Sequence, residues 1–171
     1  MSSTSTTQHK AQANLAGPVG LALVTISDTR TPQTDVNRHY LQAKIEEMGH
    51  HVVAYELIPD DPARVTAVIN QLVQTEARII LCNGGTGIAP RDTTFDALDR
   101  LLEKRLPGFG ELFRMLSWSE VGAAAMLSRA TAGVYRQRVI ISTPGSPNAV
   151  MLAWEKLIAP ELAHLAWEVV R

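Results

Sequence analysis

A glycine-rich run in the middle of the chain has the composition of a loop that binds an oxyanion. The run is Asn83-Gly84-Gly85-Thr86-Gly87, and it directly follows the apolar residues 79–82. Glycines have no Cβ, so backbone N–H groups can approach a phosphate closely, and Thr86 adds a hydroxyl. The run lacks the Lys-Ser/Thr pair of a Walker A loop and the glycine spacing of a dinucleotide fingerprint. A plain glycine turn is the competing interpretation, and the run alone does not decide between the two.

Acidic residues follow this run and two other predicted strands. Arg91 and Asp92 come just after the glycines. Asp92 could cap the next helix or bind Mg²⁺, and the two roles can coexist. Asp28 follows the first apolar strand, and Asp60-Asp61 follows the second. Asp61 precedes a proline and is the better helix cap, which leaves Asp60 for function. Solvated aspartates are common in loops, but three acids at one edge of a sheet favour a metal–phosphate site.

Two more polar groups are candidates for a ligand site. In the tight loop Thr143-Pro144-Gly145-Ser146-Pro147, Ser146 could cap the following helix, or its hydroxyl and the helix N-terminus could bind a phosphate. Ser128-Arg129 is a polar pair among small apolar residues, and surface solubility is its alternative role. No serine lies in a G-x-S-x-G turn and no nucleophilic triad is visible, so a hydrolase of that type is not favoured.

The elements that must position these loops alternate between strands and helices. Strands are expected at residues 19–26, 51–58, 78–82 and 139–142, with 134–135 and 139–141 forming a hairpin-like pair across Arg136-Gln137. Helices are expected after Asp35, at Asp61-Pro62, near Phe95, after Pro107-Gly108, at residues 123–127 and on both sides of Pro160. In the first helix, Leu41, Ile45 and Met48 should share the buried face.

This alternation predicts an α/β fold with a mainly parallel sheet and helices on both faces. Ligands of such folds bind beyond the carboxyl ends of the strands, at a switch point. That rule selects four loops, at residues 27–35, 59–61, 83–92 and 143–148.

Composition limits the function classes. The chain has 171 residues, 46% of them hydrophobic and 19% charged, with a net charge of -1, which predicts one domain that binds neither nucleic acid nor membrane. Residues 1–17 are expected to form a disordered tail. The single Cys82 is interpreted as a buried thiol. A chain with one free thiol is consistent with a cytoplasmic protein. No histidine lies at metal-ligand spacing from Cys82 or another histidine, so no zinc site is expected.

Six short motifs, taken together and in this order, resemble the MoaB/MogA family of molybdenum cofactor biosynthesis. They are TISD at 25–28, GGTG at 84–87, RD at 91–92, PGFGE at 107–111, SRA at 128–130 and TPGSP at 143–147. Each motif alone is weak, but their joint spacing is specific and covers residues 19–171. The segments FRMLSWSEVG at 113–122 and AWEKLIAPEL at 153–162 are closer to the MoaB branch than to MogA.

The resemblance implies a three-layer α/β/α fold, a molybdopterin-binding domain over residues 18–171, and a homotrimer or homohexamer. It implies a molybdopterin adenylyltransferase, which converts molybdopterin and Mg²⁺-ATP to adenylyl-molybdopterin and pyrophosphate. The alternative is a non-catalytic molybdopterin-binding or assembly protein that works with other proteins of the pathway. A third is a structural oligomer with a vestigial site. In that case residues 116–127, including Trp118, would be mostly subunit interface, or simply core.

The resemblance also assigns residues to roles. Asp92 and Asp60 would be the functional acids and would hold Mg²⁺. Substrate binding would fall to Ser27, Asp28, Gly84, Gly85, Thr86, Gly87, Ser128, Arg129, Pro144, Gly145 and Ser146, with Ser27 and Asp28 on the nucleotide side.

The sequence departs from the family pattern at two places. The family loop usually begins TGGTG, and Asn83 replaces that threonine. A DTSG-like segment often follows the first strand, and here Asp35-Val36-Asn37-Arg38 stands instead. Asn83 keeps a polar side chain, so we expect a modest effect there.

Overall fold

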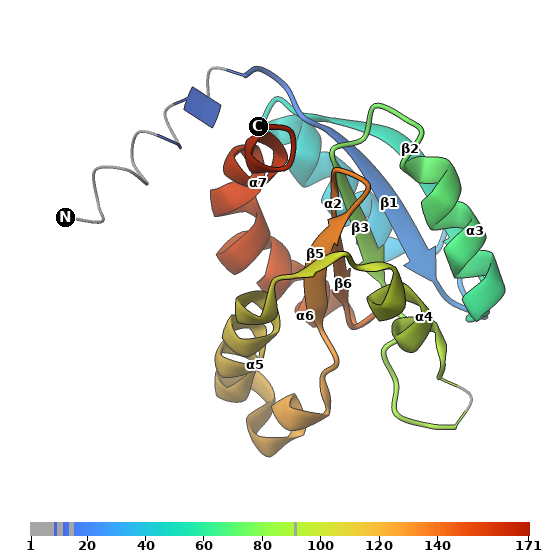
Figure 1. The fold of residues 1–171 in the computed structure, drawn as a ribbon. Coiled ribbons are helices and arrows are strands. Elements are labelled where there is room, and N and C mark those ends of the chain that lie inside the picture. Colours follow the sequence, from blue (N-terminus) through green and yellow to red (C-terminus); the bar gives the residue numbers. More distant parts are fainter. Residues whose placement is uncertain (1–8, 10–11, 14–15, 91) are drawn as a thin grey trace.

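A single mixed sheet runs through the part of the chain that the computed structural model describes, which is residues 9, 12–13, 16–90 and 92–171. Its strand order is β2-β1-β3-β6-β5-β4 (Figure 1). The strands are β1 (Gly20–Ile26), β2 (His51–Ile58), β3 (Ile79–Asn83), β4 (Lys104–Arg105), β5 (Thr131–Tyr135) and β6 (Arg138–Thr143). β2, β1, β3 and β6 are parallel, whereas β5 is antiparallel to both β6 and β4.

Helices cover both faces of this sheet, as Figure 1 shows. They are α2 (Val36–Glu47), α3 (Pro62–Leu72), α4 (Thr94–Leu101), α5 (Pro107–Val121), α6 (Pro147–Ala153) and α7 (Leu162–Glu168). The short turns η1 (Gly122–Leu127), η2 (Trp154–Ile158, a π-helix) and η3 (Ala159–Glu161) complete the chain. Within the described residues, no helix combines the length and apolar character needed to cross a membrane.

Two apolar clusters, one on each face of the sheet, hold the three layers together. Successive strand residues point to opposite faces, so β1 contributes Leu21 and Leu23 to one cluster and Ala22 and Val24 to the other. The first cluster packs α2, α5, α6 and α7 onto the sheet, and the second packs α3 and α4. Cys82 belongs to the second, where burial raises the pKa of its thiol to about 12. The predicted α/β/α architecture and the buried thiol are thus confirmed.

Most predicted elements are present, and the differences have local causes. Asp35, Asp61 and Ser146 each cap the helix that follows. Met48 was expected on the buried face of α2 but is 43% exposed, because it forms the C-cap after the last helical residue. Residues 123–127 form part of a 3₁₀ turn, and the C-terminal helices are interrupted by η2 as well as at Pro160. β4 was missed, because two charged residues leave no alternating pattern.

The predicted N-terminal tail lies mostly outside the described residues, which within residues 1–17 are 9, 12–13 and 16–17. Ala13 is 1% exposed and lines a hollow together with Ala166 and Trp167. The His9 ring lies 5.4 Å from the Trp167 ring, centre to centre. These described residues of the segment therefore lie against α7 and the end of the chain.

The turn that joins β5 to β6 has an unusual backbone conformation. Its two central residues, Arg136 and Gln137, have φ values of 46° and 59°, which cost a residue with a side chain about 1–2 kcal/mol each. Glycine is favoured at the second position of such turns. We expect Gln137→Gly to raise the free energy of unfolding by about 0.5–1 kcal/mol in urea titrations. The same substitution inside α3, Gln71→Gly, should lower it by a similar amount. A lower value for Gln137→Gly would contradict the turn geometry.

Candidate functional site

The loops that follow β1, β2, β3 and β6 share one edge of the sheet, because these four strands are parallel. The register sets Thr25 of β1, Asn83 of β3 and Thr143 of β6 side by side. The chain passes from β1 to β2 on one side and returns to β3 on the other side of β1. The loops after β1 and β3 therefore diverge at a topological switch point, where open α/β sheets bind their ligands.

Two buried asparagines lie directly beneath these loops. Asn37 and Asn83 are 1% and 2% exposed, and Asn37 Nδ2 donates to Asn83 Oδ1 over 2.7 Å. Asn83 Nδ2 donates in turn to Thr25 Oγ1 over 3.2 Å and to the Val24 carbonyl over 3.4 Å. Asn37 Nδ2 also donates to the Gly145 carbonyl over 2.9 Å. One pair of side chains thus connects α2, β1, β3 and the loop after β6.

An ion pair between a partly buried arginine and a buried aspartate fixes the same Gly145 carbonyl from the other side. Arg30 donates to it through Nη2 over 2.9 Å, and Arg30 Nη1 lies 3.1 Å from Asp35 Oδ1. Asp35, fully buried, also caps α2 through the Arg38 N–H and accepts from the Tyr55 hydroxyl over 2.8 Å. Burial alone would raise the pKa of Asp35, but hydrogen bonds from Thr25, Tyr55 and Arg38 and the Arg30 charge together lower it. The carboxylate stays charged and keeps Arg30 in place.

The two glycine-containing loops pack against each other without side chains between them. Gly84 has a φ of 101°, and a Cβ there would collide with the Ile26 carbonyl oxygen. A Cβ on Gly145 would come within 3.2 Å of the Gly84 Cα. The Gly84 N–H donates to the Thr143 carbonyl over 3.0 Å. Glycine is therefore required at position 84 by backbone conformation and by the closeness of β1.

The other N–H groups of this loop remain open. Those of Gly85, Thr86 and Gly87 donate to no other residue in the described part of the chain. The Gly84 N–H is already used by Thr143, so the oxyanion-binding capacity predicted for the run belongs to the three residues after it. Successive open N–H groups form the kind of concavity that binds anions.

Arg129 holds this loop in shape rather than facing solvent. Its Nε donates to the Thr86 carbonyl over 3.2 Å, and its Nη2 donates to the carbonyls of Gly87 and Asp92. Its Nη1 pairs with Asp96 Oδ2 over 3.1 Å, and the guanidinium lies 4.6 Å from the centre of the Phe95 ring. These contacts position the loop, and the substrate contact predicted for Arg129 stays a prediction.

Asp92 closes the loop on itself. Its Oδ2 accepts from the Ala89 N–H over 2.8 Å, and the Asp92 N–H donates to the Ala89 carbonyl over 2.9 Å. The carboxylate also occupies the space that a Cβ on Gly87 would need. The helix cap considered for Asp92 is wrong, since Thr93 is the N-cap residue of α4 and makes no side-chain capping bond. Arg91, its neighbour in the motif, lies outside the described residues.

A pocket of about 290 Å³ opens beside this loop, between α5, η1 and the loop after β6. Five of the predicted residues line it, namely Thr86, Gly87, Ser128, Pro144 and Ser146. Its volume is at the lower end of those of ligand sites. Sequence reasoning missed the polar lining residues Ser117 and Glu120, and it included Asn148 only as the last residue of the predicted loop 143–148. A larger hollow of about 510 Å³, lined by Gly49, His50 and Ala163 among others, lies at the other end of the strands and involves none of the predicted loops.

The remaining predicted residues form a second group above β1 and β2. The Ser27 hydroxyl accepts from the N–H groups of Thr29 and Arg30, and Asp28 Oδ1 accepts from the Asp60 N–H over 3.1 Å. Asp60 Oδ1 is buried and has no hydrogen-bond partner among the described residues.

The three acids do not form a compact ligand set. Asp28, Asp60 and Asp92 are absent from the groups of three or more metal-ligating side chains found among the described residues. β2 and β3 flank β1, which separates their ends by about 10 Å. A shared metal site of Asp60 and Asp92 therefore stays a prediction.

The two departures from the family pattern prove to be partners, because Asn37 and Asn83 bond to each other. Substituting Asn37 would leave Asn83 Oδ1 buried without its donor, and substituting Asn83 would remove one of the two acceptors of Asn37 Nδ2. A buried polar atom that loses its partner costs about 1–3 kcal/mol. We expect Asn83→Thr and Asn37→Ser each to lower the free energy of unfolding. The double variant should lose less than the sum, with a coupling of about 0.5–3 kcal/mol in a double-mutant cycle. The exposed Asn148→Thr should be additive with either. Additive losses for the pair would disprove the link.

The sequence matches one family of known proteins along most of its length. The family model described as a probable molybdopterin binding domain matches residues 22–164. Molybdenum cofactor biosynthesis protein B from Bacillus subtilis is 47% identical over 164 residues, which cover 95% of each chain.

The solved structures agree with the sequence comparison. A crystal structure of molybdenum cofactor biosynthesis protein B superposes with a TM-score of 0.85 at 46% identity, covering 90% of this chain and 97% of the other. A tungsten cofactor synthesizing protein MoaB from Pyrococcus furiosus gives 0.80 at 32% identity, covering 90% and 98%. Sequence, strand order and the loops at the switch point thus converge, and the chain belongs to the MoaB/MogA family of molybdenum cofactor biosynthesis proteins.

Proposed function

We propose that the chain binds molybdopterin in the 290 Å³ pocket and adenylylates it with Mg²⁺-ATP. The observation that carries this proposal is the row of open N–H groups at Gly85, Thr86 and Gly87, beside the pocket wall formed by Ser146. A terminal phosphate would accept hydrogen bonds from these groups, while the pterin would lie toward Ser117 and Asn148. Family membership supports the choice of ligand.

The reaction needs positioning and charge neutralisation more than covalent chemistry by the protein. An oxygen of the molybdopterin phosphate would form a bond to the α-phosphorus of ATP, and the bond to the β-phosphate oxygen would break with its electrons leaving on pyrophosphate. Asp60 fits a cation ligand, because its Oδ1 is buried without a hydrogen-bond partner in the described part of the chain. Asp92 would be the second ligand. When bound, Mg²⁺ would neutralise charge on the ATP phosphates.

A non-catalytic role in the same pathway is the second candidate, and two observations favour it. One oxygen of Asp92 already accepts from the Ala89 N–H, and the strand order separates Asp92 from Asp60. In that case the chain would hold molybdopterin and pass it to another protein of the pathway, and Asp92 would serve only to shape the loop.

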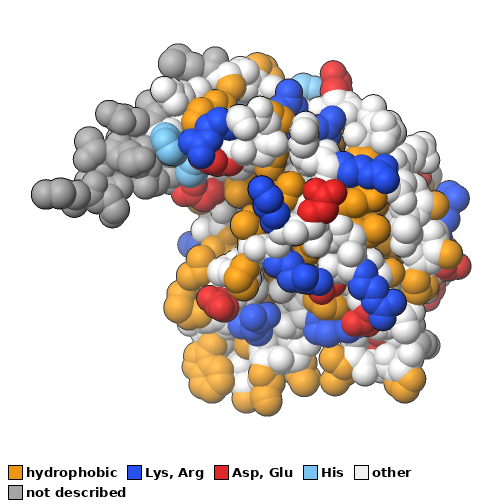
Figure 2. All heavy atoms as spheres, viewed as in Figure 1, with side chains coloured by type: hydrophobic (Ala, Val, Ile, Leu, Met, Phe, Trp, Pro, Cys, Tyr) orange, Lys and Arg blue, Asp and Glu red, His pale blue; other side chains and the backbone are white. Residues whose placement is uncertain are grey.

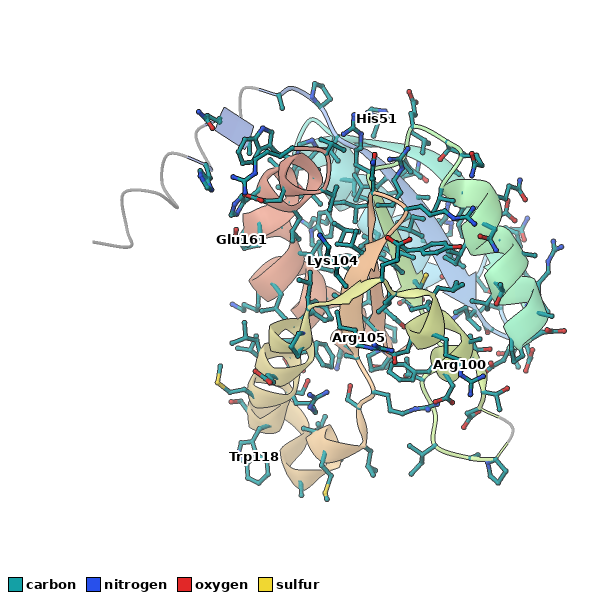
Figure 3. All side chains as sticks on the ribbon, viewed as in Figure 1. His51, Arg100, Lys104, Arg105, Trp118 and Glu161 are labelled. Carbon is teal, nitrogen blue, oxygen red and sulfur yellow. The ribbon has the colours of Figure 1, made fainter. Side chains whose placement is uncertain are left out.

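We also propose that the chain forms a homotrimer or homohexamer through α5 and η1. Six apolar side chains there are 47–72% exposed, namely Leu112, Met115, Trp118, Val121, Met126 and Leu127. Figure 2 shows hydrophobic side chains gathered at this lower end of the molecule, and Figure 3 shows Trp118 projecting away from it. Apolar patches of this kind mark interfaces. Val121 and Leu127 also line the pocket, so a second copy would lie next to the ligand.

The adenylylation assay separates the two functional candidates. Purified protein is incubated with molybdopterin and Mg²⁺-ATP, and adenylyl-molybdopterin is quantified by mass spectrometry together with pyrophosphate. We expect product from the wild type and a loss on the order of 10²-fold for Asp92→Asn and Asp60→Asn, the size typical of one charge-stabilising group. Asp99→Asn, on α4 and paired with Arg105, is the matched control and should retain activity. Molybdopterin binding without product would identify the carrier role.

The oligomer proposal predicts a change of mass. Wild-type protein should sediment as three or six chains. Trp118→Asp should shift the population to smaller species, because a buried unpaired carboxylate is costly at an apolar interface. Met48→Asp, at an exposed methionine outside the patch, should leave the mass unchanged. A monomeric wild type would refute the proposal.

A further inference from the structure

Three side chains able to bind a metal ion meet on α7, away from the pocket. His164 and Glu168 belong to α7, and His9 comes from the N-terminal segment. Their ligand atoms lie within 4.8 Å of one another, the one such group found among the described residues. The expectation that no zinc site exists rested on spacing along the sequence, which does not register a histidine brought from the other end of the chain. Figure 2 shows histidine and acidic side chains together on this side of the molecule.

The two distances from the histidine nitrogens to Glu168 suit a tetrahedral ion. Ligands about 2.0–2.2 Å from a zinc ion lie about 3.3–3.6 Å apart in tetrahedral geometry. His9 Nδ1 and His164 Nε2 each lie 3.4 Å from Glu168 Oε1. The side chains are one-quarter to one-third exposed, so an ion could enter without unfolding the site.

Neighbouring side chains orient the ligands. His164 Nδ1 lies 3.0 Å from Glu161 Oε2, which leaves Nε2 directed at Glu168. A carboxylate on the far nitrogen is the usual support of a metal-binding histidine. Figure 3 places Glu161 at the start of α7. Arg171 Nη2 lies 3.2 Å from Glu168 Oε2 and so fixes the carboxylate while Oε1 faces both histidines.

We propose that His9, His164 and Glu168 bind one divalent transition-metal ion, with Zn²⁺ as the best match, and that this ion fastens His9 to α7. Two imidazoles and one carboxylate form a zinc ligand set that leaves a fourth position for water. The Arg171 charge opposes a cation, so the site is weaker than a closed structural one. The competing role is a metal-free ion pair, in which a protonated histidine faces Glu168.

The test is a Zn²⁺ titration of the full chain after chelation, followed by calorimetry, with Co²⁺ as a spectroscopic probe. We expect one ion per chain, the intense visible absorption of tetrahedral Co²⁺, and a rise in melting temperature with Zn²⁺. His164→Ala and Glu168→Gln should remove binding, and His9→Ala should remove the thermal shift. Glu161→Gln should weaken affinity about 10–100-fold, as loss of a supporting carboxylate does.

Controls separate this site from others and from misfolding. His39→Ala changes an exposed histidine on α2 and should bind Zn²⁺ as the wild type does. Asp92→Asn should also leave the Co²⁺ spectrum unchanged, which excludes the loop acids as ligands. Melting temperatures without metal show whether each variant folds. Absence of saturable binding by the wild type, or wild-type affinity retained by His9→Ala or by His164→Ala, would overturn the proposal.

Discussion

The site depends on the carbonyl oxygen of Gly145, which accepts hydrogen bonds from Arg30 and from Asn37. These two donors reach it from the loop after β1 and from α2, and Asn37 passes the connection to Asn83 at the end of β3. The three loops at the switch point thus share one polar network. A buried donor left without its partner costs about 1–3 kcal/mol. The loss of one member of the network should therefore destabilise the positions of the others.

Apolar and polar contacts stabilise different properties of this fold, which explains why such a network lies at this edge. The two apolar clusters stabilise the three layers, but apolar contacts are non-directional. Hydrogen bonds fix geometry, and the low dielectric of the interior strengthens them. Arg129 performs the same task on the outer side, where it binds the carbonyls of Thr86, Gly87 and Asp92. With the carbonyls turned toward Arg129, the N–H groups of the same loop remain open for a ligand.

Structural features could be predicted from the sequence where they leave a pattern among residues that are close together in the chain. The strands showed as apolar runs, and Asp35, Asp61 and Ser146 showed as caps, so the fold and the shared edge of the loops could be predicted. Contacts between distant residues left no such trace. Arg30 and Gly145 are 115 positions apart, and nothing near either residue indicates the other. Ser117 and Glu120 were missed because the sequence of α5 indicated only an apolar helix. The packing of α5 beside η1 brings both residues to the pocket. Asp60 and Asp92 shared a predicted edge, but the strand order that separates them required the structure.

The central claim is that the open N–H groups after Gly84 hold the phosphate of a pterin seated in the neighbouring pocket. A crystal structure of the chain with molybdopterin tests this claim most directly. It should show the terminal phosphate within hydrogen-bonding distance of the N–H groups of Gly85, Thr86 and Gly87, with the pterin between α5 and Ser146. A ligand bound elsewhere, with these N–H groups facing only water, would contradict it.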